Sequence, residues 1–307
     1  MKGAEKIQKN GQSEIMKSHE FAKPFQVVDG SRFRLKDFKT SETLGLKSKE
    51  HAKDALERGI VRLAELQEKL YAQDRWAILI VLQAMDAAGK DSTIKHVMSG
   101  VNPQGCEVHS FKAPSAEELQ HDFLWRTSRS LPERGKIGIF NRSYYEEVLA
   151  VRVHPELLAR QKIPAQLVSE SIWQKRFEDI NSFERYITGN GIVVLKFFLH
   201  LSEEEQKKRF LERLKDPEKN WKFSASDALE RKHWGKYMQA YEDLIRNTST
   251  KHAPWYVVPA DHKWFTRLVV AEATIDAMEC LDLSFPKMDK KMQKALKDAR
   301  AALEHED

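Results

Sequence analysis

The sequence predicts an α/β fold in which a mostly parallel sheet is flanked by helices. Short, continuous apolar runs recur along the chain, and those at residues 76–82 and 191–199 are the clearest. A run of this length, bounded by polar residues and without alternation, is typical of a strand buried on both faces. Between the runs, apolar residues recur at helical spacing, as in residues 169–187. Strands that alternate with helices indicate βαβ units and therefore a parallel sheet.

The order of the elements predicts one main domain with an inserted lid. A helical period begins near residue 48, and the predicted strands are 76–82, 107–111, 137–140, 191–199 and 255–258. Residues 203–250 are highly charged and read as a helix–loop–helix, which we interpret as a lid over the strand ends. The expected organisation is an N-terminal arm with little structure of its own at 1–47, a domain at 48–284 and a charged helical tail at 285–307.

Composition argues against several classes of protein. The 51 Lys and Arg exceed the 46 Asp and Glu only slightly, which does not identify a nucleic-acid-binding protein. The apolar runs are far shorter than the roughly 20 residues of a membrane span, and the first residues lack the apolar stretch of a secretory signal. Cys106 and Cys280 lie far apart without metal-site spacing, as expected of buried thiols in a reducing compartment. We expect a cytoplasmic protein that binds neither membranes nor nucleic acid.

A phosphate-binding loop follows the first long apolar run. Residues 83–93 read QAMDAAGKDST, close to the pattern G-x-x-x-x-G-K-[ST]. In such loops the backbone N–H groups and the start of the next helix bind phosphate oxygens, and the lysine adds a mobile charge. The predicted phosphate-binding residues are Ala87, Ala88, Gly89, Lys90, Asp91 and Ser92. Ala84 and Asp91 depart from the pattern, so an ordinary strand–turn–helix with a surface lysine stays open as an alternative.

Oxygen-bearing side chains near this loop indicate a metal site. Asp86 would repel a bound phosphate unless a cation lay between them, and Mg²⁺ prefers oxygen ligands. Asn141 follows the predicted strand 137–140, at the end where ligands gather in parallel sheets. We predict that Asp86 and Asn141 hold Mg²⁺, with Mn²⁺ as an alternative ion. The alternative for Asp86 is a turn residue that bonds its own backbone.

An arginine and two glutamates follow at the same strand end. The guanidinium of Arg142 matches phosphate geometry and is a candidate for contact with a transferring phosphoryl group. Glu146 is a candidate catalytic carboxylate, although an acid favoured by the helix dipole is an equal alternative. Glu147 has the pattern of a solvated residue in a first helical turn.

Three basic residues in the predicted lid are candidates for phosphate binding. Arg209 and Arg213 lie four residues apart on one face of the predicted helix, and Lys222 follows in the loop. A closed lid would bring these cations over a bound phosphate chain. Because acidic residues are interleaved, a solvated helix face is the alternative.

Together these motifs resemble the family-2 polyphosphate kinases. The resemblance runs from about residue 38 to 278 and includes AMDAAGKDSTIKHVMSGVNPQGC, FNRSYYEEVLAVRVHPE and APWYVVPADHKWF. It implies a P-loop kinase fold similar to thymidylate kinases, with a helical lid. By this resemblance the family's Walker A acid and lysine fall on Asp86 and Lys90. Asn141 and Glu146 stand where the family usually has Asp and Asn, which is similar to the subgroup that phosphorylates both AMP and ADP.

The resemblance also implies a reaction. We expect an enzyme that moves phosphoryl groups reversibly between inorganic polyphosphate and AMP or ADP, with Mg²⁺ as cofactor. The expected catalytic residues are Asp86, Lys90, Arg142 and Glu146. The expected partners are polyphosphate, adenine nucleotides and further copies of the chain in a homo-oligomer. An ATP-dependent nucleoside-monophosphate kinase and a non-catalytic nucleotide- or polyanion-binding protein are the alternatives.

Overall fold

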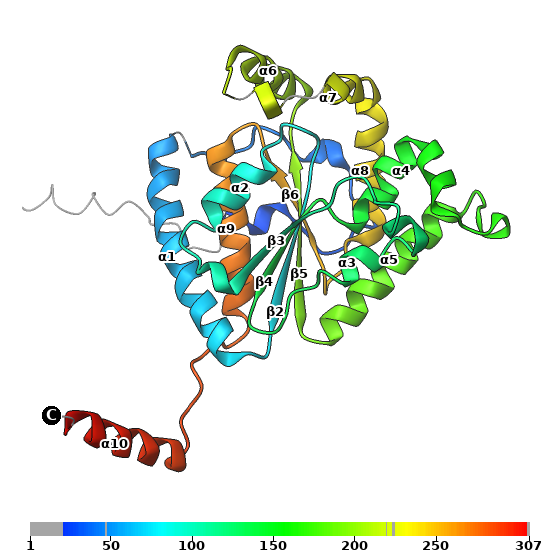
Figure 1. Ribbon diagram of the computed structural model, residues 1–307. Coiled ribbons are helices and arrows are strands. Elements are labelled where there is room, and N and C mark those ends of the chain that lie inside the picture. Colours follow the sequence, from blue (N-terminus) through cyan, green and yellow to red (C-terminus); the bar gives the residue numbers. More distant parts are fainter. Residues whose placement is uncertain (1–20, 47, 219, 223–224, 306–307) are drawn as a thin grey trace, which may run out of the picture.

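The computed structural model describes residues 21–46, 48–218, 220–222 and 225–305. Within them a six-stranded sheet has the order β1-β6-β5-β2-β4-β3 (Figure 1). The strands are β1 Gln26–Val27, β2 Ala77–Gln83, β3 Cys106–Ser110, β4 Ile137–Asn141, β5 Ile192–His200 and β6 Trp255–Pro259. All neighbours pair in parallel except β1, which is antiparallel to β6. The predicted α/β class and the five predicted strands are confirmed.

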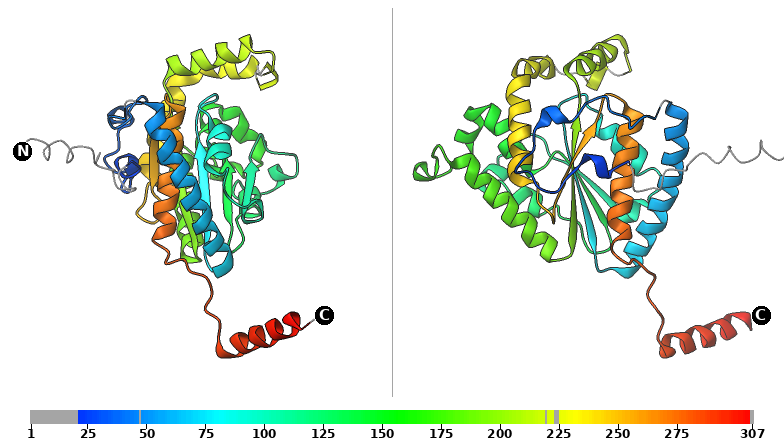
Figure 2. Two further views of the ribbon diagram at one scale, coloured as in Figure 1. Left: turned by 90° about the vertical axis from the view of Figure 1, so that its left-hand side faces the viewer. Right: turned by 180° about the vertical axis from the view of Figure 1, so that it is seen from behind.

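Helices cover both faces of the sheet (Figures 1 and 2). One face carries α1 Lys49–Gln73, α2 Lys90–Val97 and α9 Lys263–Glu279, and the other carries α3 Trp125–Ser128, α4 Ala150–Val153, α5 Ile172–Gly189 and α8 Trp234–Thr248. The strand β2 is buried on both faces: Ile78, Ile80 and Leu82 belong to one hydrophobic core, and Leu79 and Val81 to the other. This is why its sequence is continuously apolar rather than alternating.

The second half of the predicted N-terminal arm is part of the domain. Phe21, Phe25, Phe33 and Leu35 are buried, and Gln26 pairs with Tyr256 at the edge of the sheet. The expectation of an arm with little structure therefore does not hold for residues 21–46, because aromatic residues spaced irregularly give no periodic signal. Residues 1–20 lie outside the described part of the chain.

The predicted lid is shorter than expected. The helix α6 Glu203–Lys215 follows β5 directly, and α7 Ala225–Glu230 leads back toward α8. Figures 1 and 2 show α6 and α7 projecting from the end of the molecule where β5 ends. In α8 the residues Ala240, Tyr241, Leu244 and Ile245 are buried in the domain core. The second lid helix thus belongs to the helical layer rather than to the projection.

The C-terminal helix stands apart from the domain. The helix α10 Lys290–Glu304 has no buried residue, and Figures 1 and 2 show it away from the main body. Cys280 at the end of α9 is exposed, and Cys106 is partly buried. The expectation of two buried thiols was wrong for Cys280, because the chain leaves the domain at this point. No helix in the described ranges is long and apolar enough to cross a membrane.

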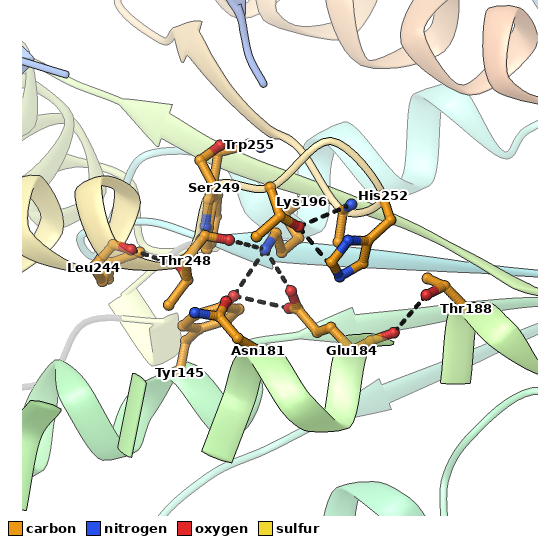
Figure 3. A network of polar contacts seen from close by, with 12 residues as sticks. Tyr145, Asn181, Glu184, Thr188, Lys196, Leu244, Thr248, Ser249, His252 and Trp255 are labelled. Atoms are coloured by element: carbon orange, nitrogen blue, oxygen red, sulfur yellow. Dashed lines mark hydrogen bonds and ion pairs between the residues drawn. The ribbon is translucent and has the colours of Figure 1, made fainter. Parts of the chain in front are cut away.

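A buried ion pair joins β5 to the helices on one face (Figure 3). Lys196 is fully buried, and its Nζ donates to Glu184 Oε2 at 2.6 Å, to the Thr248 carbonyl at 2.7 Å and to the Tyr145 hydroxyl at 3.0 Å. Glu184 Oε1 accepts from the hydroxyls of Tyr144 and Tyr145, each at 2.8 Å. Burial lowers the pKa of Lys196, and Glu184 opposes that shift. The pair therefore fixes the turn at Tyr144 and Tyr145 against the sheet.

This pair should respond to substitution as one unit. Either Lys196→Met or Glu184→Gln alone removes the charge partner inside the core, and we expect each to lower the free energy of unfolding by about 3–5 kcal/mol. The double variant leaves no unpaired charge, so its loss should be much smaller than the sum. Urea denaturation of the four proteins measures this, and additive losses would show that the two charges are not coupled.

Candidate active site

The predicted phosphate-binding loop links β2 to α2. Ala87 has φ 64° and Gly89 has φ 108°, both in the left-handed region that turns the chain sharply into the helix. Lys90 is buried, and its Nζ donates to the Ala84 carbonyl at 3.0 Å. Burial lowers the pKa of this amine. The lysine is therefore held back into the loop rather than extended into solvent, contrary to the alternative of a surface lysine.

Residues from the end of β4 meet this loop. Leu82 of β2 is in register with Asn141 of β4, and the Arg142 backbone N–H donates to the Leu82 carbonyl at 3.0 Å. Arg142 Nη2 contacts Asp86 Oδ1 at 2.7 Å, and Asn141 Nδ2 donates to Asp91 Oδ1 at 2.7 Å. The parallel sheet thus brings together four residues that the sequence assigned to two separate motifs. Arg142 has φ 65°, a strained backbone conformation of the kind found at functional sites.

The charge of Arg142 is secured by two acids. Burial alone would lower the pKa of this guanidinium, but Glu146 and Asp86 outweigh burial and raise it above its ordinary value. Arg142 nevertheless stays partly open to solvent, with 39% of its side chain exposed. Glu146 Oε1 accepts a hydrogen bond from Gln83 Nε2 at 2.9 Å. An arginine that is charged, partly exposed and paired with Asp86 of the predicted phosphate-binding loop has the position expected of a residue that contacts a phosphate.

A pocket of about 260 Å³ opens beside Arg142 and Glu146. Its apolar wall includes Phe111, Leu119, Phe123 and Leu157, while Arg126 and Arg160 add positive charge. Acids such as Glu118 and Asp122 also line it, and a pocket with an apolar wall and charged groups suits a small organic molecule with polar or charged groups. The sequence pattern does not predict this pocket, because its walls come from irregular segments at residues 111–126 and 142–161 that carry no periodicity.

Glu147 lies inside the protein rather than in a solvated helical turn. It is 5% exposed, and its carboxylate accepts from Arg176 Nε at 3.0 Å and from Gln161 Nε2 at 2.7 Å. Burial raises the pKa of Glu147, although Arg176 and Gln161 act in the opposite direction. The interpretation of Glu147 as a surface acid was therefore wrong. Its partners lie 14 and 29 residues away along the chain, beyond the reach of a local sequence pattern.

Arg209 does not face the space above the loop as expected of a lid cation. It is buried, and its five N–H groups make five hydrogen bonds within the protein. The acceptors are the carbonyls of Ala87, Ala88, Ala260 and Asp261 and the carboxylate of Glu205. With every donor engaged, Arg209 in this conformation supports the phosphate-binding loop from behind. Direct contact of Arg209 with phosphate stays a prediction, and it is disfavoured because every N–H group of the guanidinium already has an acceptor within the protein.

The other lid residues differ from one another. Gln206 is buried, and its Nε2 donates to the Asp86 carbonyl at 2.8 Å while its Oε1 accepts from Arg231 Nη1 at 2.6 Å. Arg213 is partly exposed, and its guanidinium lies 5.7 Å from the centre of the Phe210 ring. The side chain of Lys222 lies outside the described part of the structure. Of the two predicted lid arginines, Arg209 is buried and Arg213 is partly exposed.

Oxygen ligands suitable for a divalent ion converge at the loop. Asp86 Oδ1 and Asp91 Oδ1 are paired with Arg142 and Asn141, which leaves the second oxygen of each carboxylate. Because Asn141 uses its amide nitrogen toward Asp91, its carbonyl oxygen is also left for a ligand role. Within the described ranges no group of three or more His, Cys, Asp or Glu side chains forms a ready metal site. A donor set of few carboxylates fits Mg²⁺, which keeps several waters and shares phosphate oxygens.

Comparisons with known proteins identify the family of this chain. Residues 46–286 match the sequence model of polyphosphate kinase 2. The ADP-polyphosphate phosphotransferase of Rhodopseudomonas palustris is 51% identical over 92% of this chain and 98% of its own length. The AMP/ADP-polyphosphate phosphotransferase of Meiothermus ruber is 43% identical over 89% of this chain and 98% of its own length.

The fold agrees as well. The crystal structure of polyphosphate kinase 2 from Arthrobacter aurescens TC1 superimposes with a TM-score of 0.82 at 40% identity, covering 91% of this chain and 98% of that one. The family match extends through the loop, the β4 end, the pocket segments and the lid. The chain therefore belongs to the polyphosphate kinase 2 family.

Proposed function

We propose that this protein is a Mg²⁺-dependent phosphotransferase that forms ADP from AMP and ATP from ADP with inorganic polyphosphate as donor, and that the reaction is reversible. The observation that carries the proposal is the contact between Asp86 and Arg142. It joins the phosphate-binding loop to the mouth of the pocket, so that a phosphate chain and an acceptor would meet at these two residues. The names of the relatives, which include both ADP and AMP as substrates, support the choice of acceptor.

The residues suggest direct transfer without a covalent intermediate. The loop amides and Lys90 would hold the end of the phosphate chain, and the pocket would hold the acceptor nucleotide with its phosphate toward Arg142. An acceptor phosphate oxygen attacks the terminal phosphorus of the chain, a new P–O bond forms, and the bridging P–O bond to the shortened chain breaks. Asp86, Asp91 and Asn141 would hold Mg²⁺, or Mn²⁺ in its place, which supplies neutralising charge to the phosphate oxygens. Arg142 would stabilise charge on the transferring group.

One assay tests the proposal against its alternatives. The protein is incubated with AMP and either long-chain polyphosphate or ATP, and the nucleotides are separated by chromatography. ADP and ATP formed from AMP with polyphosphate support the proposal. ADP formed only with ATP would identify a nucleoside-monophosphate kinase, and no product with either donor would identify a binding protein.

Loss of the loop lysine should abolish catalysis without unfolding the protein. We expect Lys90→Ala to lower kcat by about 10²–10³-fold, the range seen when one transition-state contact is removed. The fold should persist, because Lys90 makes one internal hydrogen bond and its charge is desolvated. Steady-state kinetics and circular dichroism measure both effects. Lys95→Ala on the exposed side of α2 is the matched control, and near-normal turnover in Lys90→Ala would rule out the loop as the site.

Asp86 should control the response to Mg²⁺. We expect Asp86→Asn to cut kcat strongly and to raise the Mg²⁺ concentration needed for half-maximal activity, because a neutral amide is a weaker ligand than a carboxylate. The measurement is a Mg²⁺ titration at fixed polyphosphate and AMP. Asp179→Asn, on the exposed surface of α5, should leave the titration unchanged. An unaltered titration in Asp86→Asn would make Asp86 a turn residue only.

The two lid arginines should give different phenotypes. Arg213→Ala should raise the KM for polyphosphate at low salt, and its difference from the wild type should shrink as salt screens the exposed charge. Arg209→Ala should lower both the melting temperature and kcat, because it leaves three buried carbonyl groups and one partly buried carbonyl group without this donor. Kinetics at several salt concentrations and thermal unfolding separate the two. Identical, salt-sensitive losses with unchanged stability would return Arg209 to the role of a lid cation.

Glu146 should influence the choice between acceptors. AMP is one phosphate shorter than ADP and leaves space near Glu146 that a carboxylate with its water or cation can fill. We therefore expect Glu146→Asn to reduce kcat/KM for AMP more than kcat/KM for ADP. Both values are measured at saturating polyphosphate and fixed free Mg²⁺. Equal reductions, or none, would show that Glu146 does not distinguish the acceptors.

A further inference from the structure

Gln83 is a buried glutamine with one partner. It ends β2 immediately before the phosphate-binding loop and is 0% exposed. Its Nε2 donates to Glu146 Oε1 at 2.9 Å, while its Oε1 is buried with no hydrogen-bond donor. The orientation of the amide follows from chemistry, because a carboxylate accepts hydrogen bonds and only the nitrogen can supply one. The one polar contact of this side chain is therefore directed at an acid that lines the pocket.

Such a residue is a poor choice for stability. A buried amide left half-satisfied destabilises the fold compared with an apolar side chain of the same volume. The residues before it in β2, from Ala77 to Leu82, are all apolar and buried, so the position would readily accept a methionine. The amide of Gln83 is explained better by its hydrogen bond to Glu146 than by packing.

Glu146 has a second, competing attraction. Its negative charge is close enough to Arg142 to raise the pKa of the guanidinium. Yet Arg142 makes its hydrogen bond to Asp86, and Glu146 makes its bond to Gln83. Gln83 thus donates a hydrogen bond to the carboxylate of Glu146, and Arg142 pairs with Asp86 of the loop instead.

We infer that Gln83 is a specificity-determining residue that acts through Glu146. Its amide holds the carboxylate at the pocket wall, where it favours the shorter acceptor, and keeps it from pairing with Arg142. The inference rests on the proposed function, because the acceptors it distinguishes are AMP and ADP. Gln83 is a positioning residue. In the proposed reaction it contacts neither the phosphate chain nor the reacting atoms.

The test is a double-mutant cycle on acceptor preference. The proteins are wild type, Gln83→Met, Glu146→Asn and the double variant, and the measurement is kcat/KM for AMP and for ADP at saturating polyphosphate and fixed free Mg²⁺. We expect Gln83→Met to lower the AMP-to-ADP ratio about five- to tenfold, as for loss of one ordinary hydrogen bond. In the Glu146→Asn background the same substitution should leave the ratio unchanged, because Gln83 acts only through that carboxylate. The melting temperature of the Gln83→Met single variant should equal or exceed that of the wild type.

Controls separate this role from packing and from the reaction itself. Gln67→Met replaces another buried glutamine with an unpaired Oε1. Gln67 lies in α1, and its substitution should leave the AMP-to-ADP ratio unchanged. If Gln83→Met does not fold, Gln83→Asn withdraws the amide while keeping it polar and should give the same ratio. Equal losses of kcat/KM for AMP and ADP would overturn the inference. The same change of ratio on Gln83→Met with and without Glu146 would also overturn it, and neither result would contradict the proposed reaction. Absence of polyphosphate-dependent product in the wild type overturns the proposed function instead.

Discussion

Parallel pairing of β2 with β4 determines how the residues of the candidate site lie relative to one another. The register that sets Leu82 beside Asn141 makes both strands end at the same edge, and the bond from the Arg142 N–H to the Leu82 carbonyl extends the pairing one residue further. Asp86 and Arg142, like Asp91 and Asn141, then meet across the gap between the two strand ends. A shift of one residue in this register would turn alternate side chains to the opposite face and separate both pairs.

The strand ends are held from two sides. Below the β4 end, Glu184 and Lys196 fix the hydroxyls of Tyr144 and Tyr145, which follow Arg142 within three residues. Behind the loop, Arg209 and Gln206 hold the carbonyls of residues 86–88. Because these donors hold the loop carbonyls away from the site, loop N–H groups without a partner in the loop could face a phosphate, whereas the Ala88 N–H donates to the Met85 carbonyl at 3.3 Å. Precise placement of such donors before substrate arrives is what electrostatic catalysis requires.

Local signals in the sequence were sufficient for the strands and the loop, and insufficient for side-chain partners. Continuous apolar runs and the spacing of Gly89 and Lys90 are set by neighbours along the chain, so they were read correctly. Four of the five acceptors of Arg209 are 51 to 122 residues away, and helical spacing alone cannot show whether that face of α6 points inward or outward. The pocket and the Gln83–Glu146 bond were missed for the same reason, since 63 residues separate the two side chains.

In the proposed reaction, the pairing of Asp86 with Arg142 would link metal binding to the arrival of the phosphate chain. Asp86 forms an ion pair with Arg142, which partly neutralises its charge before any substrate is bound, whereas Asp91 accepts a hydrogen bond from the neutral amide of Asn141. In the proposed reaction a phosphate chain attracts Arg142 more strongly than a single carboxylate does, because it offers several anionic oxygens to the same fork of donors. Once Arg142 turns to phosphate, Asp86 loses its cation and needs another. Under the proposed function the polyanion and Mg²⁺ would therefore favour each other's binding, whereas a neutral residue at position 86 would remove the link.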